Sequence, residues 1–429
     1  MLFGNSESLK LKHDLVAGLH LSKIICLSTM ALASSQVRGD TDIYQLVLKI
    51  LISSEKHAVV LDIGTAYTKV GYAGESSPRA ILKTPQTFDT LDKEVLHDEL
   101  VEFVHRLYFE VLLVNPKDRR VVLLESLLGE TRLKDELVEV LFNHFEVLSI
   151  LFAPSHLMPL YGLGLQNALV VDVGFSSTSV IPVYQSVPIL KAWQALPLGG
   201  QALHESIKKE ISSRGTIKVG ESEFEKFEDT KVELQEEVIE DIKVRLCFVP
   251  RLGRGQQIQQ IRQDASSVSG LSSFLKQSVP SVDYTLTGES VLKIDGQTRE
   301  GASEVLFEQD NDRLSLSTMV LDALITSPID TRKELAQNII IIGGTASQLG
   351  LKARLFQEIE FLMKQKYYQD KLKLTDFKLH IPLGKENYAA WVGASIFGAT
   401  DAISTRSFTR EQYSKDRAVP DWSDLRNFC

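Results

Sequence analysis

Short apolar runs alternate with amphipathic stretches along most of the chain, and this pattern predicts an α/β fold. The apolar runs are rich in β-branched residues and bounded by turn residues, as buried strands are. Such runs cover residues 58–61, 112–115, 121–124, 168–171, 284–286, 291–294 and 338–342. Amphipathic spacing predicts helices over 131–145 and around 314–324. Buried strands that alternate with helices favour mixed sheets covered by helices.

Three segments depart from this pattern. Residues 1–55 show no clear period, so we expect a poorly ordered extension, although 44–52 has the apolar content of a short helix or strand. Residues 221–241 carry ten acidic and two basic side chains with apolar residues between them, which predicts an amphipathic helix with a solvated acidic face. Residues 251–281 hold six glutamines and seven serines, which predicts a mobile loop or a partly helical insertion.

The composition narrows the function classes. The 429 residues include 47 basic and 56 acidic side chains, so the formal net charge is −9. Nonspecific nucleic-acid binding needs a basic face, and this balance therefore argues against nucleic acid as a partner. Cys26, Cys247 and Cys429 lack the spacing of a zinc site or a redox motif, which is typical of a reducing compartment. No apolar run approaches the ~20 residues that span a bilayer, so we expect no membrane insertion.

An internal repeat is the main indication of function. Segment 58–65 recurs as segment 168–175, and each reads as a buried strand, an aspartate, one apolar residue and a glycine before a second strand. The equivalent pairs are Asp62 and Asp172, Gly64 and Gly174, and Thr68 and Thr178. Each copy therefore predicts a β-hairpin with an acidic residue and a glycine at its tip.

Two such tips that face each other make a phosphate clamp. Glycine lets the backbone approach a ligand closely, and successive backbone N–H groups at a turn bind anions. An aspartate beside them holds Mg²⁺, usually through water, and Lys69 is placed to reach a phosphate as a point charge. Residues 343–345, Gly-Gly-Thr, lie between a predicted strand and a helix, where the backbone can admit an adenosine. The pattern predicts a nucleotide site.

Competing nucleotide and hydrolase motifs do not fit. Residues 215–220 have the glycine spacing of a P-loop, but Glu221 stands where the lysine is needed. Residues 162–164, Gly-Leu-Gly, lack the third glycine of a dinucleotide fingerprint. The chain has no G-x-S-x-G nucleophile elbow. The paired hairpins therefore remain the best nucleotide motif.

These motifs resemble those of actin and its relatives. The first hairpin and its exit at Pro78-Arg79, the second hairpin, a helix beside the nucleotide, the adenosine loop and a late tryptophan motif follow in the family's order over residues 56–429. They are segments 62–75, 172–174, 241–249, 342–345 and 391–396. The resemblance implies a two-lobed actin-like fold with a nucleotide cleft. Lobe I would comprise 56–162 and 389–429, and lobe II would comprise 163–388.

The resemblance also assigns residues. ATP or ADP with Mg²⁺ would be bound by Asp62, Gly64, Thr65, Lys69, Asp172, Gly174, Lys243, Gly343, Gly344 and Thr345. Asp62 and Asp172 would hold the metal ion through water. The family's filament-contact groove would be lined by Tyr161, Gly162, Gly164 and Phe397.

Departures from the family pattern argue against hydrolysis. In register with Asp172, Ser155 and Ser179 fall where actins carry the glutamine and the histidine that position the attacking water. A serine orients this water less well, and the positioning that hydrolysis needs is lost. Further replacements are Ile63, Phe175, Val244 and Asn387. The resemblance thus implies a pseudo-ATPase that retains its nucleotide and catalyses nothing.

A deletion separates the chain from conventional actin. Only residues 80–107 lie between Arg79 and Tyr108, where actins need a longer segment for a small sheet and the loop that inserts into the next subunit. We therefore expect an outer subdomain shortened at 80–104 and a truncated pointed-end face, with the opposite barbed-end face retained. A subunit that docks by one face only terminates a filament.

Within the family, segments 114–122, 153–158 and 196–200 fit the branch that caps the pointed end of dynactin. This implies a cytoplasmic, cytoskeletal subunit that contacts the filament of actin-related protein one and the pointed-end subunits, and through them dynein and membrane cargo. Two alternatives stay open. One is a nuclear actin-related subunit of a chromatin-remodelling complex, and the other is an active ATPase or kinase of the same fold.

Overall fold

The computed structural model describes residues 57–421, apart from 91, 221–222, 231, 264–278, 287 and 289. The expected extension at 1–55 and residues 264–278 of the glutamine- and serine-rich segment therefore lie outside the described residues. The first part of that segment, Leu252–Gln263, forms helix α8, in agreement with the partly helical alternative.

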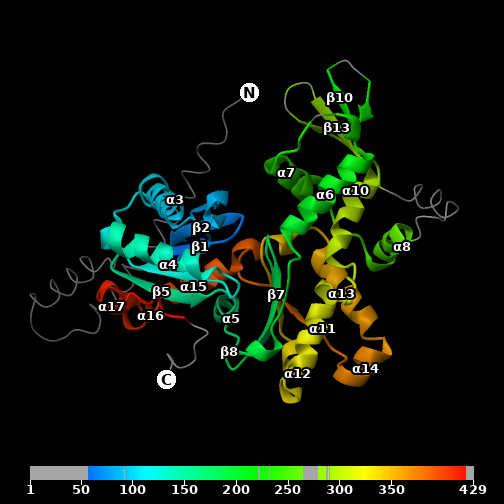
Figure 1. Ribbon diagram of the computed structural model, residues 1–429. Helices are drawn as coiled ribbons and strands as arrows, with labels where there is room; N and C mark the ends of the chain where they lie inside the picture. The colour runs from blue at the N-terminus through cyan, green and yellow to red at the C-terminus, as the bar shows by residue number, and fades with distance from the viewer. Residues whose placement is uncertain are drawn as a thin grey trace, which may run out of the picture. The chain divides into compact units, whose positions relative to one another are not determined.

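The first sheet is built around the first predicted hairpin (Figure 1). Its strands run in the order β16-β5-β4-β1-β2-β3. They are β1 Val59–Ile63, β2 Tyr67–Tyr72, β3 Ala80–Lys83, β4 Val121–Glu125, β5 Ser149–Pro154 and β16 Phe408–Thr409. β1, β4 and β5 are parallel, whereas β2 and β3 return antiparallel. All five residues of β4 are buried because helices cover both faces of a parallel sheet centre.

The second sheet repeats this plan. Its order is β15-β14-β6-β7-β8, with β9 also paired to β7. Its strands are β6 Ala168–Val173, β7 Thr178–Tyr184, β8 Val187–Pro188, β9 Gln194–Leu196, β14 Ile339–Ile342 and β15 Leu379–His380. The hairpin β6/β7 lies beside the parallel strand β14, just as β1/β2 lies beside β4. The sequence repeat is therefore a repeat of sheet topology and register, which confirms the two-hairpin prediction.

A third sheet is small and antiparallel, with the order β11-β10-β13-β12. Its strands are β10 Thr216–Val219, β11 Glu225–Lys226, β12 Val282–Thr285 and β13 Ser290–Ile294. The acidic segment enters this sheet, so the prediction of a helix over all of 221–241 is wrong. The helix α7 begins at Glu236, after a strand and a 3₁₀ turn.

The helices cover the sheets and connect their strands (Figure 1). The α-helices are α3 Lys93–Arg106, α4 Thr131–Glu139, α5 Met158–Leu163, α6 Gly200–Arg214, α7 Glu236–Leu246, α8 Leu252–Gln263, α10 Gly296–Gly301, α11 Leu316–Thr326, α12 Ile329–Ala336, α13 Leu351–Leu362, α14 Lys366–Leu372, α15 Ala389–Gly398, α16 Ala402–Thr405 and α17 Arg410–Asp416. The 3₁₀ turns are η1 Gln86–Asp89, η3 Pro116–Asp118, η5 Leu190–Ala192, η6 Phe227–Asp229, η7 Ala302–Leu306, η8 Thr345–Ser347 and η9 Glu386–Tyr388.

Helices α3 and α4 both end in a π-helical turn, η2 Leu107–Val111 and η4 Val140–His144. Each π turn is followed by a residue with positive φ, Leu113 at 55° and Glu146 at 54°. The strand predicted over 112–115 is therefore wrong, because these apolar residues close a helix. An apolar run of this length does not distinguish a buried strand from a buried helix end.

Separate apolar clusters tie the helices to their sheets. One packs α3 and α4 on the first sheet, and another packs α11 and α13 on the second. A third joins α5 and α15 to β1 and β4 around Trp391, which is fully buried and donates from Nε1 to Val60 O at 3.2 Å. Burial of each large aliphatic side chain contributes about 1.5–3 kcal/mol.

Among the described residues, no helix is both long and apolar enough to cross a membrane.

We predict that Gly393→Ala is strongly destabilising because α15 crosses α5 in backbone contact there. A Cβ at Gly393 would overlap the carbonyl oxygen of Met158. Because this oxygen belongs to the backbone, the two helices would have to separate. We expect a loss of about 1–3 kcal/mol in the free energy of unfolding, measured by urea denaturation. Gly253→Ala in α8 is the matched control, since a Cβ there meets nothing within 4 Å, and it should be neutral or slightly stabilising. Equal stability of the two variants would contradict the crossing.

Candidate functional site

The tip of the first hairpin is a tight turn at Gly64. Its N–H donates to Tyr67 O at 3.2 Å, and its carbonyl accepts from Thr84 Oγ1 at 2.7 Å. Thr84 also lies 2.9 Å from the buried Thr68 hydroxyl, which fixes it below the turn. A Cβ at Gly64 would lie 2.9 Å from Tyr67 O, so the turn has little room for a side chain.

The second hairpin has the same turn at Gly174. Its N–H donates to Ser177 O at 3.0 Å. Its carbonyl accepts from Thr345 Oγ1 at 2.7 Å and from the N–H of Gly200 at 3.1 Å. In both hairpins a threonine hydroxyl from another element binds the glycine carbonyl. Thr345 is a predicted site residue, whereas Thr84 was not identified from the sequence because its partner is known only from the fold.

The two tips meet, and they bring three charged side chains together. Thr65 Oγ1 lies 3.3 Å from Ser176 Oγ on the opposite tip. Lys69 Nζ forms an ion pair with Asp62 Oδ2 at 3.0 Å across the first hairpin. Burial raises the pKa of the neighbouring Asp172 to about 6. The charge of Lys69 lowers this pKa, and the charge of Asp62 raises it. An additional cation at this point would favour the charged form of Asp172.

The glycine loop after β14 lies directly against the second hairpin. Gly343 has a φ of 100°, and a Cβ there would collide with Val173 O and approach Asp172 Oδ1 to 2.6 Å. Only glycine fits this position. The next residue, Gly344, has an ordinary helical φ of −62°, and a Cβ there meets nothing within 4 Å. The backbone at Gly344 therefore borders open space.

These features fit the phosphates of a nucleotide. The two turns are cradles too narrow for side chains, and Lys69 supplies a cation. Asn387 Oδ1 is buried near the glycine loop without a hydrogen-bond donor among the described residues, so it is open to a donor on a ligand. Within the described part of the chain, no three histidine, cysteine or acidic side chains gather as metal ligands. Asp62 and Asp172 alone would hold Mg²⁺ through water and phosphate oxygens.

Lys243 forms its ion pair and its side-chain hydrogen bonds with residues of the chain itself. Its Nζ lies 2.5 Å from Glu240 Oε2 and 3.3 Å from His204 Nε2. The His204 ring contacts Glu236 through Nδ1 and Glu240 through Nε2, both at 2.8 Å. Burial alone would raise the pKa of Glu240, but hydrogen bonding to His204 and the charge of Lys243 lower it to about 2. The charge of Lys243 is thus balanced by Glu240. Gln348, which follows the glycine loop, donates from Nε2 to the backbone carbonyl oxygen of Lys243 at 3.4 Å.

His204 was missed by the sequence interpretation because its partners are 32 and 36 residues away. It also supports Phe175 at the second tip, since the two rings make an edge contact with centroids 5.3 Å apart. The ring of Phe175 covers Gly200, whose Cβ would lie 2.8 Å from it. Phe175 is one of the replacements in the family pattern, where relatives carry an acidic residue. Its apolar ring packs against His204 and Gly200 at the tip of the second hairpin.

The predicted groove residues lie at the ends of α5 and α15. Tyr161 is 43% exposed, and its ring contacts that of Phe397 edge to face at 5.3 Å. The Leu383 side chain packs against Gly162, where a Cβ would lie 3.3 Å from Leu383 Cδ1. Gly164 ends α5 with a left-handed φ of 67° and has nothing within 4 Å of its Cβ position. The half-exposed Leu383 is an apolar neighbour that the sequence did not indicate.

We predict that Asp172→Asn stabilises the protein when nucleotide and divalent cations have been removed. The folded-state pKa near 6 exceeds the ordinary value near 4, so folding favours the protonated form. The associated stability is present below pH ~4 and is lost as the pH rises through 6. At pH 7.5 the variant should be about 1–3 kcal/mol more stable by urea denaturation, and the difference should shrink towards pH 5.

Asp283→Asn is the control for this experiment, because Asp283 is exposed on β12 and its replacement should change stability by less than about 0.5 kcal/mol. A variant at position 172 that is less stable than the wild type at pH 7.5 would refute the assigned burial of this carboxylate.

Comparison with known proteins identifies the fold family. The model of the family described as actin matches residues 95–419. Among curated proteins, the chain is 25% identical over 449 aligned positions to "Actin-related protein 10" of Dictyostelium discoideum, covering 87% of this chain and 90% of that protein. The first hairpin lies before the matched range, but it repeats the turn geometry of the second hairpin, which lies inside that range. The paired sheets and the family match together show that this chain is a member of the actin family with the two-lobed α/β fold of that family.

Proposed function

We propose that this chain is a non-catalytic actin-related subunit of dynactin that caps the pointed end of the filament of actin-related protein one. The observation that carries the proposal is the short connection between β3 and α3. β3 ends at Lys83 and α3 begins at Lys93, with the 3₁₀ turn η1 between them. The connection is too short for the small sheet and the inserting loop by which conventional actin subunits receive a neighbour.

The connection also packs against helix α3 and the first hairpin. Phe88 is 4% exposed, and its ring meets Phe103 of α3 edge to face at 5.4 Å. Thr84 is buried below the first hairpin, and Lys83 forms an ion pair with Glu237 on α7. The described residues of this connection thus pack against the end of the first sheet, and none of them forms a projecting element for a further subunit.

The predicted groove residues Tyr161 and Phe397 make a ring contact at 5.3 Å, and the Tyr161 ring is 43% exposed, so it would be available as the remaining docking face. A subunit with one docking face ends a filament, since heterologous contacts propagate only when both faces are available. The similarity to "Actin-related protein 10" supports this assignment, because the sequence resembles the pointed-end relative, which is numbered tenth or eleventh. The proposed partners are the filament and the pointed-end subunits, and through them dynein and membrane cargo in the cytoplasm.

We further propose that ATP or ADP with Mg²⁺ is retained in the cleft and not turned over. The turns at Gly64 and Gly174, with Thr65 and Lys69, would bind the phosphates, and the backbone of Gly343, Gly344 and Thr345 would border the adenosine. The metal ion would neutralise phosphate charge beside Asp62 and Asp172. The short Ser155 and Ser179 side chains would leave the attacking water poorly oriented. The bound nucleotide would stabilise the closed lobes by linkage.

Tyr161→Asp should release the protein from its assembly, because it places a charge in the proposed contact groove. On a sucrose gradient of native extract, with mass spectrometry of co-migrating proteins, the wild type should migrate with dynactin subunits and the variant near the top. Tyr367→Asp is the matched control, since Tyr367 is an exposed tyrosine on α14 away from the groove. Wild-type migration as a monomer or with chromatin remodellers would overturn the dynactin assignment.

Gly344→Glu should abolish retained nucleotide, because its side chain enters the space that the adenosine would take. The nucleotide released by acid denaturation is measured by ion-exchange chromatography. Gly344→Ala is the control, since the helical φ of −62° and the open surroundings accept an alanine, so most of the nucleotide should remain. Unchanged nucleotide content in the glutamate variant would show that the adenosine lies elsewhere.

A further inference from the structure

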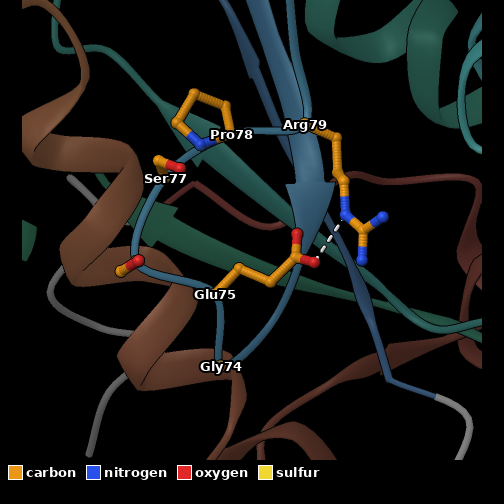
Figure 2. A pocket seen from close by; sticks show the side chains of 6 residues that line it. Gly74, Glu75, Ser77, Pro78 and Arg79 are labelled. Carbon is orange, nitrogen blue, oxygen red and sulfur yellow. Dashed lines mark hydrogen bonds and ion pairs between the residues drawn. The ribbon is translucent and has the colours of Figure 1, made fainter. Parts of the chain in front are cut away.

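The loop between β2 and β3, residues 74–79, encloses a surface hollow of about 490 Å³ (Figure 2). The loop is fixed at its base by α15, because the Gly74 N–H donates to Ser395 O at 3.1 Å and Ser395 Oγ donates to Glu75 O at 2.7 Å. Above this base, Ser76, Ser77 and Arg79 are exposed and Pro78 is half-buried. The loop is therefore anchored at one end and accessible at the other.

Positive charge predominates among the side chains beside this loop. The guanidinium groups of Arg79 and Arg119 lie 5.4 and 5.6 Å from the centre of the Tyr72 ring. Glu75 is the carboxylate that pairs here, accepting from Arg79 Nε at 2.6 Å and from the Tyr72 N–H at 3.0 Å. Arg119 Nε is buried and has no hydrogen-bond acceptor among the described residues. Glu75 thus pairs with Arg79, whereas Arg119 donates from Nη1 to the carbonyl oxygen of His57 at 3.1 Å. A further anion beside Arg79 would be electrostatically favoured.

The exposed tip of the loop carries a phosphate acceptor. Ser77 is exposed, Pro78 follows it directly, and both line the hollow together with Arg79 (Figure 2). We propose that Ser77 is phosphorylated by a proline-directed protein kinase and that Arg79 pairs with the resulting phosphate. Ser77 Oγ attacks the γ-phosphorus of ATP held by the kinase and forms the new O–P bond. The bond from that phosphorus to the β-phosphate oxygen breaks, ADP leaves, and the hydroxyl proton passes to the base of the kinase.

The phosphate would change the contacts that hold the loop. It adds a charge of about −1.5 to −2 and competes with Glu75 for the guanidinium of Arg79. The backbone of Glu75 would stay anchored to α15, because its carbonyl accepts from Ser395 Oγ at 2.7 Å. The modification site itself does not depend on the proposed dynactin role, since it rests on the loop and its charges alone.

The first test is phosphorylation of the full-length protein by a purified proline-directed kinase with ATP, followed by mapping of phosphosites by mass spectrometry. We expect near-stoichiometric modification of Ser77 and at least a tenfold reduction in Pro78→Ala. The neighbouring Ser76, which is also exposed but not followed by proline, is the internal control and should stay unmodified. Absence of phosphate on Ser77, or undiminished phosphorylation of Pro78→Ala, would overturn the proposal.

The second test asks whether Arg79 pairs with the phosphate. Phosphorus NMR of the phosphorylated protein over a pH range gives the second ionisation of the phosphate, which lies near pH 6 without a partner. Pairing with Arg79 should move this transition to lower pH, and Arg79→Gln should return it towards 6. Arg119→Gln, which removes the other guanidinium on Tyr72, should have a smaller effect. Identical transitions in the wild type and Arg79→Gln would refute the pairing.

Discussion

Backbone contact at glycine positions is the constraint on which the rest of this structure depends. Gly343 can follow β14 only because it lacks a Cβ, which would collide with the carbonyl of Val173 on the neighbouring strand. This contact lets Thr345 reach the carbonyl of Gly174 and fix the second hairpin turn. The same kind of turn at Gly64 is fixed by Thr84. The sheet pairing and the candidate site therefore rely on the same close approaches.

Charges in the cleft are arranged in two groups of different character. Around Asp172, burial opposes ionisation and a cation would relieve that cost. Around His204, by contrast, Lys243 and Glu240 already neutralise one another, as the low pKa of Glu240 indicates. The group around Asp172 would thus gain from a bound cation, whereas the group around His204 is balanced by the chain's own residues.

The sequence predicted those parts of the fold that follow from local pattern. The strands around Asp62 and Asp172 and the glycine loop at Gly343 were identified because each combines a buried run with a turn residue. The pairing of His204 with Glu240 was not, because it joins two helices that only tertiary packing brings together. The apolar residues at 112–115 were misassigned because a π turn closes the preceding helix with the same short apolar run that a strand would show.

A short connection has consequences beyond its own residues. Since η1 packs Phe88 against α3, the chain passes from the first sheet to its covering helix without a protruding subdomain. Removal of that subdomain would deprive a neighbour of its docking site, whereas the proposed contact residues Tyr161 and Phe397 lie on α5 and α15. The two docking faces that we propose for this chain would therefore rest on different elements of the fold. One can be lost without unfolding the other, and this independence is what would allow a filament-forming fold to become a filament end.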